Sequence, residues 1–190
     1  MNLPNLLTII RMALVPVFIV FFYLGQDGAR LFCVLAFAVF LIASATDAVD
    51  GHIARSRNLI TNFGKLMDPL ADKVLTTAAF IVFVDVHIIP AWMVIVVLAR
   101  EFIITGLRGV AASDGVVIAA ELSGKLKTVF QMLAICFILL DSAIGNTAGT
   151  HSIWVIVSTL GLILLWIAVV LTVYSGVEYL WKGRKLLNLK

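Results

Sequence analysis

The segment "LFCVLAFAVFLIASATDAVDGHIARSRNLITNFGKLMDPLADKVLTTAAFIVFV", residues 31–84, holds two apolar runs separated by a polar stretch with four aspartates. Asp47 and Asp50 close the first run, and Asp68 and Asp72 precede the second, at 74–84. That second run is too short to cross a bilayer, which takes about 20 residues. Its helix must therefore reach back to about residue 66. The pattern predicts two antiparallel membrane helices whose acidic ends meet.

The rest of the chain is equally apolar. Of its 190 residues 62% are hydrophobic and 13% are charged, and the mean hydropathy is +1.11, whereas soluble domains contain about 45–50% apolar residues. This composition predicts an all-α integral membrane protein. Six transmembrane helices are expected, and they leave room only for a single transmembrane domain, residues 1–190; the spans are 6–25, 31–50, 66–86, 88–107, 122–141 and 153–181.

Basic residues are distributed unevenly between the two sides of this topology. Of the 14 lysines and arginines, only Arg30 falls in the odd-numbered loops near 26–30, 85–88 and 142–151. Positively charged loops stay in the cytoplasm, so both termini and the acidic segment are predicted to be cytoplasmic. The net charge of +3 then reflects topology and attraction to anionic lipid, and no nucleic-acid partner is expected.

The four aspartates are spaced to act together. Asp47 and Asp50 lie three residues apart and Asp68 and Asp72 lie four apart, so each pair shares a helix face. Four carboxylates inside a membrane would cost up to about 10–14 kcal/mol, so they need neutralising charge. Neighbouring bases at helix ends are one source. Two Mg²⁺ ions are another, because hard cations prefer oxygen ligands, and magnesium also binds phosphates. The predicted ligand is therefore a pyrophosphate group bridged by these metal ions.

The acidic segment also matches a complete motif. The pattern D-x2-D-G-x2-A-R-x8-G-x3-D-x3-D is present at every fixed position, and the chain therefore resembles the CDP-alcohol phosphatidyltransferases; the positions are Asp47, Asp50, Gly51, Ala54, Arg55, Gly64, Asp68 and Asp72. The resemblance implies the six-helix fold of that family and transfer of a phosphatidyl group from CDP-diacylglycerol to an alcohol, with release of CMP. It also implies a multi-pass protein of the bacterial inner membrane and a homodimer.

Site residues follow from this resemblance. All four aspartates are expected to bind two Mg²⁺ ions, with Mn²⁺ as an alternative, and Asp72 is expected to be the general base. Residues implied in CDP-diacylglycerol binding are Gly51, Ala54, Arg55, Thr61, Gly64, Asn5 and Thr8. Independently of the family, Gly51 lets the backbone approach a nucleotide, and Arg55 offers a fork of donors to phosphate. Residues 2–11 also fit a capped interfacial helix start, with Arg11 snorkelling to the interface.

The acceptor alcohol is predicted from segments outside the motif. "AREFIITGLR" at 99–108 and "GKLKT" at 124–128 resemble members of the family whose acceptor is glycerol 3-phosphate. Glu101, Thr105 and Arg108 share one helix stripe. The acceptor phosphate is predicted to bind Arg108, Lys125 and Lys127, followed by Arg100, since guanidinium and ammonium groups are strong phosphate donors. Each base also fits an interfacial anchor. Inositol phosphate, serine and phosphatidylglycerol are the alternative acceptors.

Two other functions use acidic residues in a membrane. Intramembrane prenyltransferases bind a diphosphate through Mg²⁺, but they need about nine spans and a different aspartate spacing. A divalent-cation carrier would continue its polar residues toward the far side of the bilayer. Here the charged groups gather at the predicted cytoplasmic side, which favours the transferase.

Overall fold

The computed structural model describes the backbone of residues 3–56, 62–113, 122–145 and 151–183. Side chains are described for 6–46, 70–71, 73–113, 122–145 and 153–182. Within these ranges the chain forms six α-helices; they are α1 (Leu3–Gln26), α2 (Arg30–Ser56), α3 (Asn62–Asp85), α4 (Ala91–Ser113), α5 (Leu122–Ile144) and α6 (His151–Gly183). The predicted all-α fold is confirmed. Helix α3 reaches back even further than predicted, to Asn62.

Three of these helices contain long, strongly apolar segments that can cross a membrane; they are Leu6–Gln26, Leu122–Ile144 and Ile153–Lys182. In α2 the apolar part of the described chain is the shorter segment Arg30–Thr46. Helices α2, α3 and α4 all carry charged residues along their length. The most hydrophobic helices are therefore α1 and α6, and charged residues are most numerous on α2 and α3.

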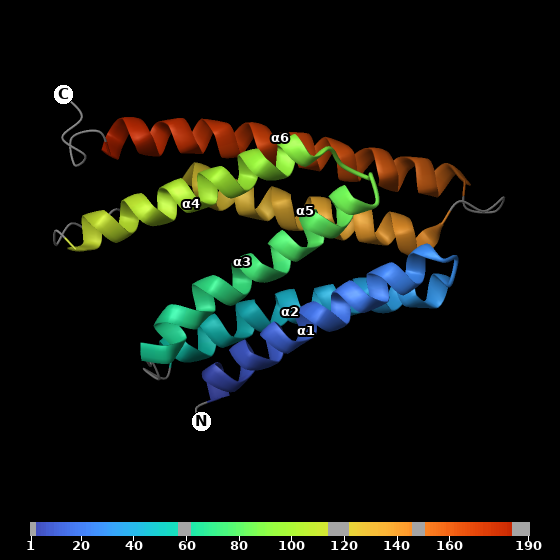
Figure 1. Ribbon diagram of the computed structural model, residues 1–190, viewed down its shortest axis with the longest axis horizontal. Helices are drawn as coiled ribbons and strands as arrows, with labels where there is room; N and C mark the ends of the chain where they lie inside the picture. Colours follow the sequence, from blue (N-terminus) through green and yellow to red (C-terminus); the bar gives the residue numbers. More distant parts are fainter. Residues whose placement is uncertain (1–2, 57–61, 114–121, 146–150, 184–190) are drawn as a thin grey trace.

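The helices run up and down with neighbouring pairs packed together. Helix α1 packs along α2 and α5 along α6, while α2 also contacts α5 and α4 contacts α6. Figure 1 shows the start of α1, the end of α2 and the start of α3 at one end of the bundle, together with the end of α4, the start of α5 and the end of α6. The described helix ends that adjoin the polar segments predicted to be cytoplasmic thus lie at the same end.

Aromatic side chains interlock the first three helices. The Phe18 ring lies 6.1 Å from that of Phe22 and 5.9 Å from that of Phe40 on α2. Phe22 in turn lies 5.6 Å from Phe83 on α3. Because lipid tails are as apolar as these side chains, such close packing, rather than exclusion from water, holds membrane helices together. Pro16 lies within α1 without ending it, as membrane helices tolerate.

Candidate functional site

The backbone of α2 and α3 brings the two predicted acidic pairs to matching depths. Asp50 lies six residues before the end of α2, and Asp68 lies six residues after the start of α3, which is about 9 Å from each helix end. Asp47 and Asp72 lie about 14 and 15 Å from the same ends. The end of α2 and the start of α3 lie at the same end of the bundle (Figure 1), and all four acidic positions belong to these two helix segments.

The side chains of the motif residues are not among those that the structure describes. This applies to Asp47, Asp50, Asp68 and Asp72, to Gly51, Ala54, Arg55 and Gly64, and to Asn5, while Thr61 lies outside the described backbone as well. Their predicted roles in metal and CDP-diacylglycerol binding therefore stay predictions. The helical backbone agrees with the spacing argument, because each pair lies within one continuous helix.

Thr8 and Arg11 on α1 lie level with the acidic residues of α2. Measured from the turn that joins the two helices, Arg11 is about 23 Å along α1 and Asp47 is about 26 Å along α2. Thr8 is about 27 Å and Asp50 about 30 Å from the same turn. Thr8 is 1% exposed and Arg11 is completely buried. Both side chains are engaged in interactions within the protein.

Burial of Arg11 corrects one sequence-based interpretation. A snorkelling arginine would extend its guanidinium to the interface, but this side chain has no exposed surface. A signal was present in the sequence: Thr8, Arg11, Val15, Phe18 and Phe22 recur every three or four residues, which is one helix face. All five are buried against the bundle. Arg11 is thus a buried cation at the depth of the predicted metal ligands, and sequence reasoning assigned it no role there.

A second charged cluster joins three helices around Glu101. The ammonium group of Lys127 on α5 contacts Glu101 Oε1 on α4, and Lys73 Nζ on α3 lies 3.7 Å from Glu101 Oε2. Arg100 Nη1 lies 3.6 Å from Glu101 Oε1. Lys73 also donates a 2.5 Å hydrogen bond to Thr105 Oγ1. Three cations therefore surround one carboxylate.

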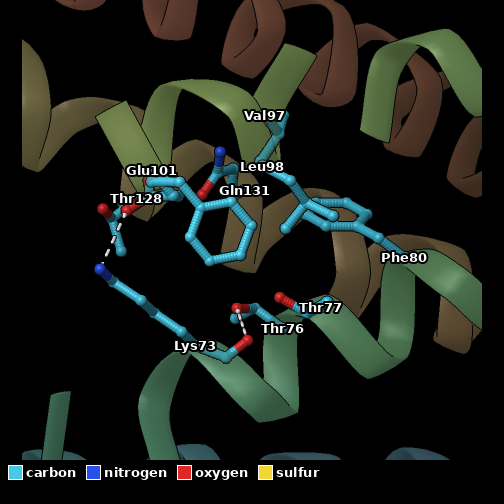
Figure 2. A pocket seen from close by; sticks show the side chains of 10 residues that line it. Lys73, Thr76, Thr77, Phe80, Val97, Leu98, Glu101, Thr128 and Gln131 are labelled. Atoms are coloured by element: carbon cyan, nitrogen blue, oxygen red, sulfur yellow. Dashed lines mark hydrogen bonds and ion pairs between the residues drawn. The ribbon is translucent and has the colours of Figure 1, made fainter. Parts of the chain in front are cut away.

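Beside this cluster, α3, α4 and α5 enclose a pocket with about 550 Å³ of unfilled space, its open mouth included. Figure 2 shows Lys73 reaching across it toward Glu101, with Thr76 and Thr77 on the same wall. Its lining residues are Lys73, Thr76, Thr77, Phe80, Val97, Leu98, Glu101, Phe102, Thr128 and Gln131. Lys73, one of its lining residues, follows the predicted general base Asp72 in the chain.

The four predicted acceptor-phosphate residues separate into two groups. Arg108 near the end of α4 and Lys125 near the start of α5 are exposed at the same end of the bundle. Lys127 is only 3% exposed and contacts Glu101. The Arg100 side chain is 10% exposed and lies over the Tyr179 ring of α6, 5.5 Å from its centre. Of these four, only Arg108 and Lys125 are open to a soluble anion in this state.

Comparison with known proteins agrees with the motif. The family model for CDP-alcohol phosphatidyltransferases matches residues 1–174. A Bacillus subtilis protein named CDP-diacylglycerol–glycerol-3-phosphate 3-phosphatidyltransferase is 43% identical, over 98% of this chain and 99% of its own length. Proteins of the same name from Rickettsia bellii and Haemophilus influenzae are 41% and 36% identical over at least 93% of both chains. The chain is a member of the CDP-alcohol phosphatidyltransferase family.

Proposed function

We propose that this protein transfers the phosphatidyl group of CDP-diacylglycerol to glycerol 3-phosphate, a step of phospholipid biosynthesis that yields phosphatidylglycerophosphate and CMP. The observation that carries this proposal is full-length similarity to relatives of that name. Two acidic pairs at matching depths on α2 and α3 support it, because the reaction needs a diphosphate held at a membrane surface. The whole chain, residues 1–190, is then one catalytic domain.

The donor set suits divalent cations. Asp47, Asp50, Asp68 and Asp72 offer only oxygen ligands, and four such positions at the adjoining ends of α2 and α3 fit two hard divalent ions. We assign these residues to two Mg²⁺ ions, with Mn²⁺ as the alternative. When bound, such ions neutralise and polarise a diphosphate, which lowers the free energy of the charge that develops in the transition state.

The chain's own residues supply the remaining chemistry. Arg55 donates to the diphosphate, while Gly51, Ala54 and Gly64 admit the nucleotide closely, with Asn5, Thr8 and Thr61 completing its site. Asp72 accepts the proton of the acceptor hydroxyl as that oxygen attacks the phosphatidyl phosphorus. The bond from this phosphorus to the bridging oxygen breaks, and CMP leaves with the electron pair.

The reaction is tested directly with purified protein, Mg²⁺, CDP-diacylglycerol and labelled glycerol 3-phosphate. We expect labelled lipid and CMP in equal amounts, and we expect EDTA to abolish both products and added Mg²⁺ to restore them. Labelled lipid formed from inositol phosphate, serine or phosphatidylglycerol, but not from glycerol 3-phosphate, would contradict the acceptor and keep the family. Divalent-cation flux in liposomes without CMP release would instead support a carrier.

Arg108 and Lys125 are proposed to hold the acceptor phosphate, supported by their exposure at the end of the bundle that carries the aspartates. Changing either to glutamine should raise the KM for glycerol 3-phosphate about tenfold, because a hydrogen bond to a charged group contributes about 1.5–3 kcal/mol. The KM for CDP-diacylglycerol should stay unchanged. Lys182→Gln removes one positive charge from the same end and serves as the control. Equal KM values in all three variants would remove both residues from the acceptor site.

We further propose that the active end faces the cytoplasm of a bacterial inner membrane and that the protein works as a homodimer. The orientation is supported by the basic residues at the bundle end that contains the starts of α3 and α5, since positive loops remain cytoplasmic. Soluble glycerol 3-phosphate and CMP would exchange freely there. The dimer rests on family resemblance.

A further inference from the structure

Two nitrogens of a buried guanidinium lack hydrogen-bond partners. The Arg100 side chain is 10% exposed, and its Nε and Nη2 atoms are buried and make no hydrogen bond. Its remaining nitrogen, Nη1, approaches Glu101 at 3.6 Å, and the guanidinium lies over Tyr179. Buried donors are nearly always satisfied, so an exception in a native protein indicates a missing partner. A guanidinium can only donate, hence that partner is an acceptor.

Helices α5 and α6 both carry glycine where this side chain passes. A Cβ atom at Gly124 would lie 3.3 Å from Arg100 Nη2, and one at Gly176 would lie 3.2 Å from Arg100 Cγ. Either contact is tighter than ordinary van der Waals packing. The two glycines therefore leave space for Arg100 between α4, α5 and α6, and they let its guanidinium turn without meeting a side chain at those positions.

Arg100 also lines a groove between α4 and α6 with about 570 Å³ of unfilled space, its open side included. Apolar side chains form its other walls, among them Val96, Ile103, Val173, Val177 and Leu180. On α6 the groove extends from Thr172 to Leu180, about 12 Å along the helix. Ile103, Val173 and Val177 are 49%, 50% and 58% exposed, so the groove opens to the surface that faces lipid.

Positively charged side chains gather near Arg100. Lys73 and Lys127 approach the same Glu101 carboxylate as Arg100 does. The lining residues of the groove come from α4 and α6, whereas the predicted metal ligands belong to α2 and α3. A soluble anion would gain nothing from the apolar walls, whereas an acyl chain would.

We propose that the groove between α4 and α6 binds an anionic phospholipid of the surrounding leaflet, which is not consumed in the reaction. One acyl chain lies along Val96, Val173 and Val177, and the lipid phosphate accepts hydrogen bonds from Nε and Nη2 of Arg100. These nitrogens are buried, so the guanidinium turns toward the groove on binding, through the space at Gly124 and Gly176. Charge-assisted, bidentate contacts of this kind are strong.

Native mass spectrometry of the delipidated protein in detergent tests this site, with palmitoyl-oleoyl phosphatidylglycerol and palmitoyl-oleoyl phosphatidylcholine as probes. The wild type should retain one phosphatidylglycerol in preference to phosphatidylcholine. Arg100→Gln should bind it about tenfold more weakly, since hydrogen bonds to a charged group are lost. Excess CDP-diacylglycerol should not displace it. Displacement by CDP-diacylglycerol, or equal binding of the two probes, would overturn the proposal.

Two variants separate the site from general effects on folding or charge. Val173→Trp fills the groove from an exposed position and leaves Arg100 in place, so it should also release the lipid. Lys182→Gln removes the same charge at the same end of the bundle, from a side chain that is 59% exposed, and should retain the lipid. Wild-type binding by Val173→Trp or Arg100→Gln, or loss of binding in Lys182→Gln, would contradict the assignment.

Discussion

Asp72→Asn should lower kcat by about 10³-fold, because general-base catalysis contributes about 10²–10⁴-fold and the same change removes a charged metal ligand. Asparagine keeps the size of the side chain but can neither accept the proton nor neutralise a cation. Release of CMP at saturating CDP-diacylglycerol and glycerol 3-phosphate measures the effect. The midpoint of thermal unfolding should not fall, because a carboxylate inside the membrane is costly without its ions.

The matched control for this change is Asp85→Asn, which makes the same substitution at the opposite end of α3. Asp85 Oδ2 accepts a 2.8 Å hydrogen bond from the Tyr23 hydroxyl in an exposed position, about 20 Å along the helix from Asp72. The kcat of the Asp85→Asn variant should stay within about twofold of the wild-type value, since surface substitutions away from a site have small effects. Comparable rates for Asp72→Asn and the wild type would exclude Asp72 as the base.

Glu101→Gln should be the most destabilising single change in the described charged cluster. It removes the negative charge that contacts Lys127, which is 3% exposed, and that also lies close to Lys73 and Arg100. Breaking a buried ion pair from one side costs about 3–5 kcal/mol. For a chain of this size, a loss of about 3 kcal/mol, the lower end of that range, lowers the midpoint of thermal unfolding by about 6–12 °C. Unfolding in detergent, followed by size-exclusion chromatography, measures it.

A double variant tells an ion-pair effect from a simple packing effect. Adding Lys127→Met to Glu101→Gln also removes the cation that Glu101 contacts, so more than half of the decrease in the thermal midpoint should be reversed. Glu178→Gln alters the pair formed with the exposed Lys182 and should change the midpoint little, because exposed pairs contribute little. Two results would show that Glu101 does not neutralise Lys127. In one, the effects of the two substitutions on the thermal midpoint simply add in the double variant; in the other, Glu178→Gln lowers the midpoint as much as Glu101→Gln does.

Hydropathy predicted the existence and order of all six helices but not their ends. Helix α2 continues from residue 50 to Ser56, α3 begins at Asn62 rather than at 66, and α4 continues from residue 107 to Ser113. An apolar run marks only the part of a helix that lies in hydrocarbon. Backbone hydrogen bonding extends further, so the polar residues next to each run are helical too.

The charged cluster shows what spacing within one segment cannot reveal. The stripe of Glu101, Thr105 and Arg108 was predicted from the sequence, and Glu101 and Thr105 do both face Lys73. That Lys73 and Lys127 meet at Glu101 depends on how α3, α4 and α5 pack, which local periodicity does not contain. Arg11 is the opposite case, because its spacing from Phe18 and Phe22 places it on their helix face, and that periodicity is itself a sign of burial.

The early pairing of α1 and α2 has a consequence for biogenesis. Chains emerge from the ribosome with the N-terminal part first, so this hairpin can close through Phe18 and Phe40 before α3 is synthesised. Thr8 and Arg11, which are buried in the complete bundle, are then already in the membrane when α3 is synthesised. The order of synthesis therefore places a cation in the membrane, where an isolated charge is costly, before the carboxylates of α3 arrive.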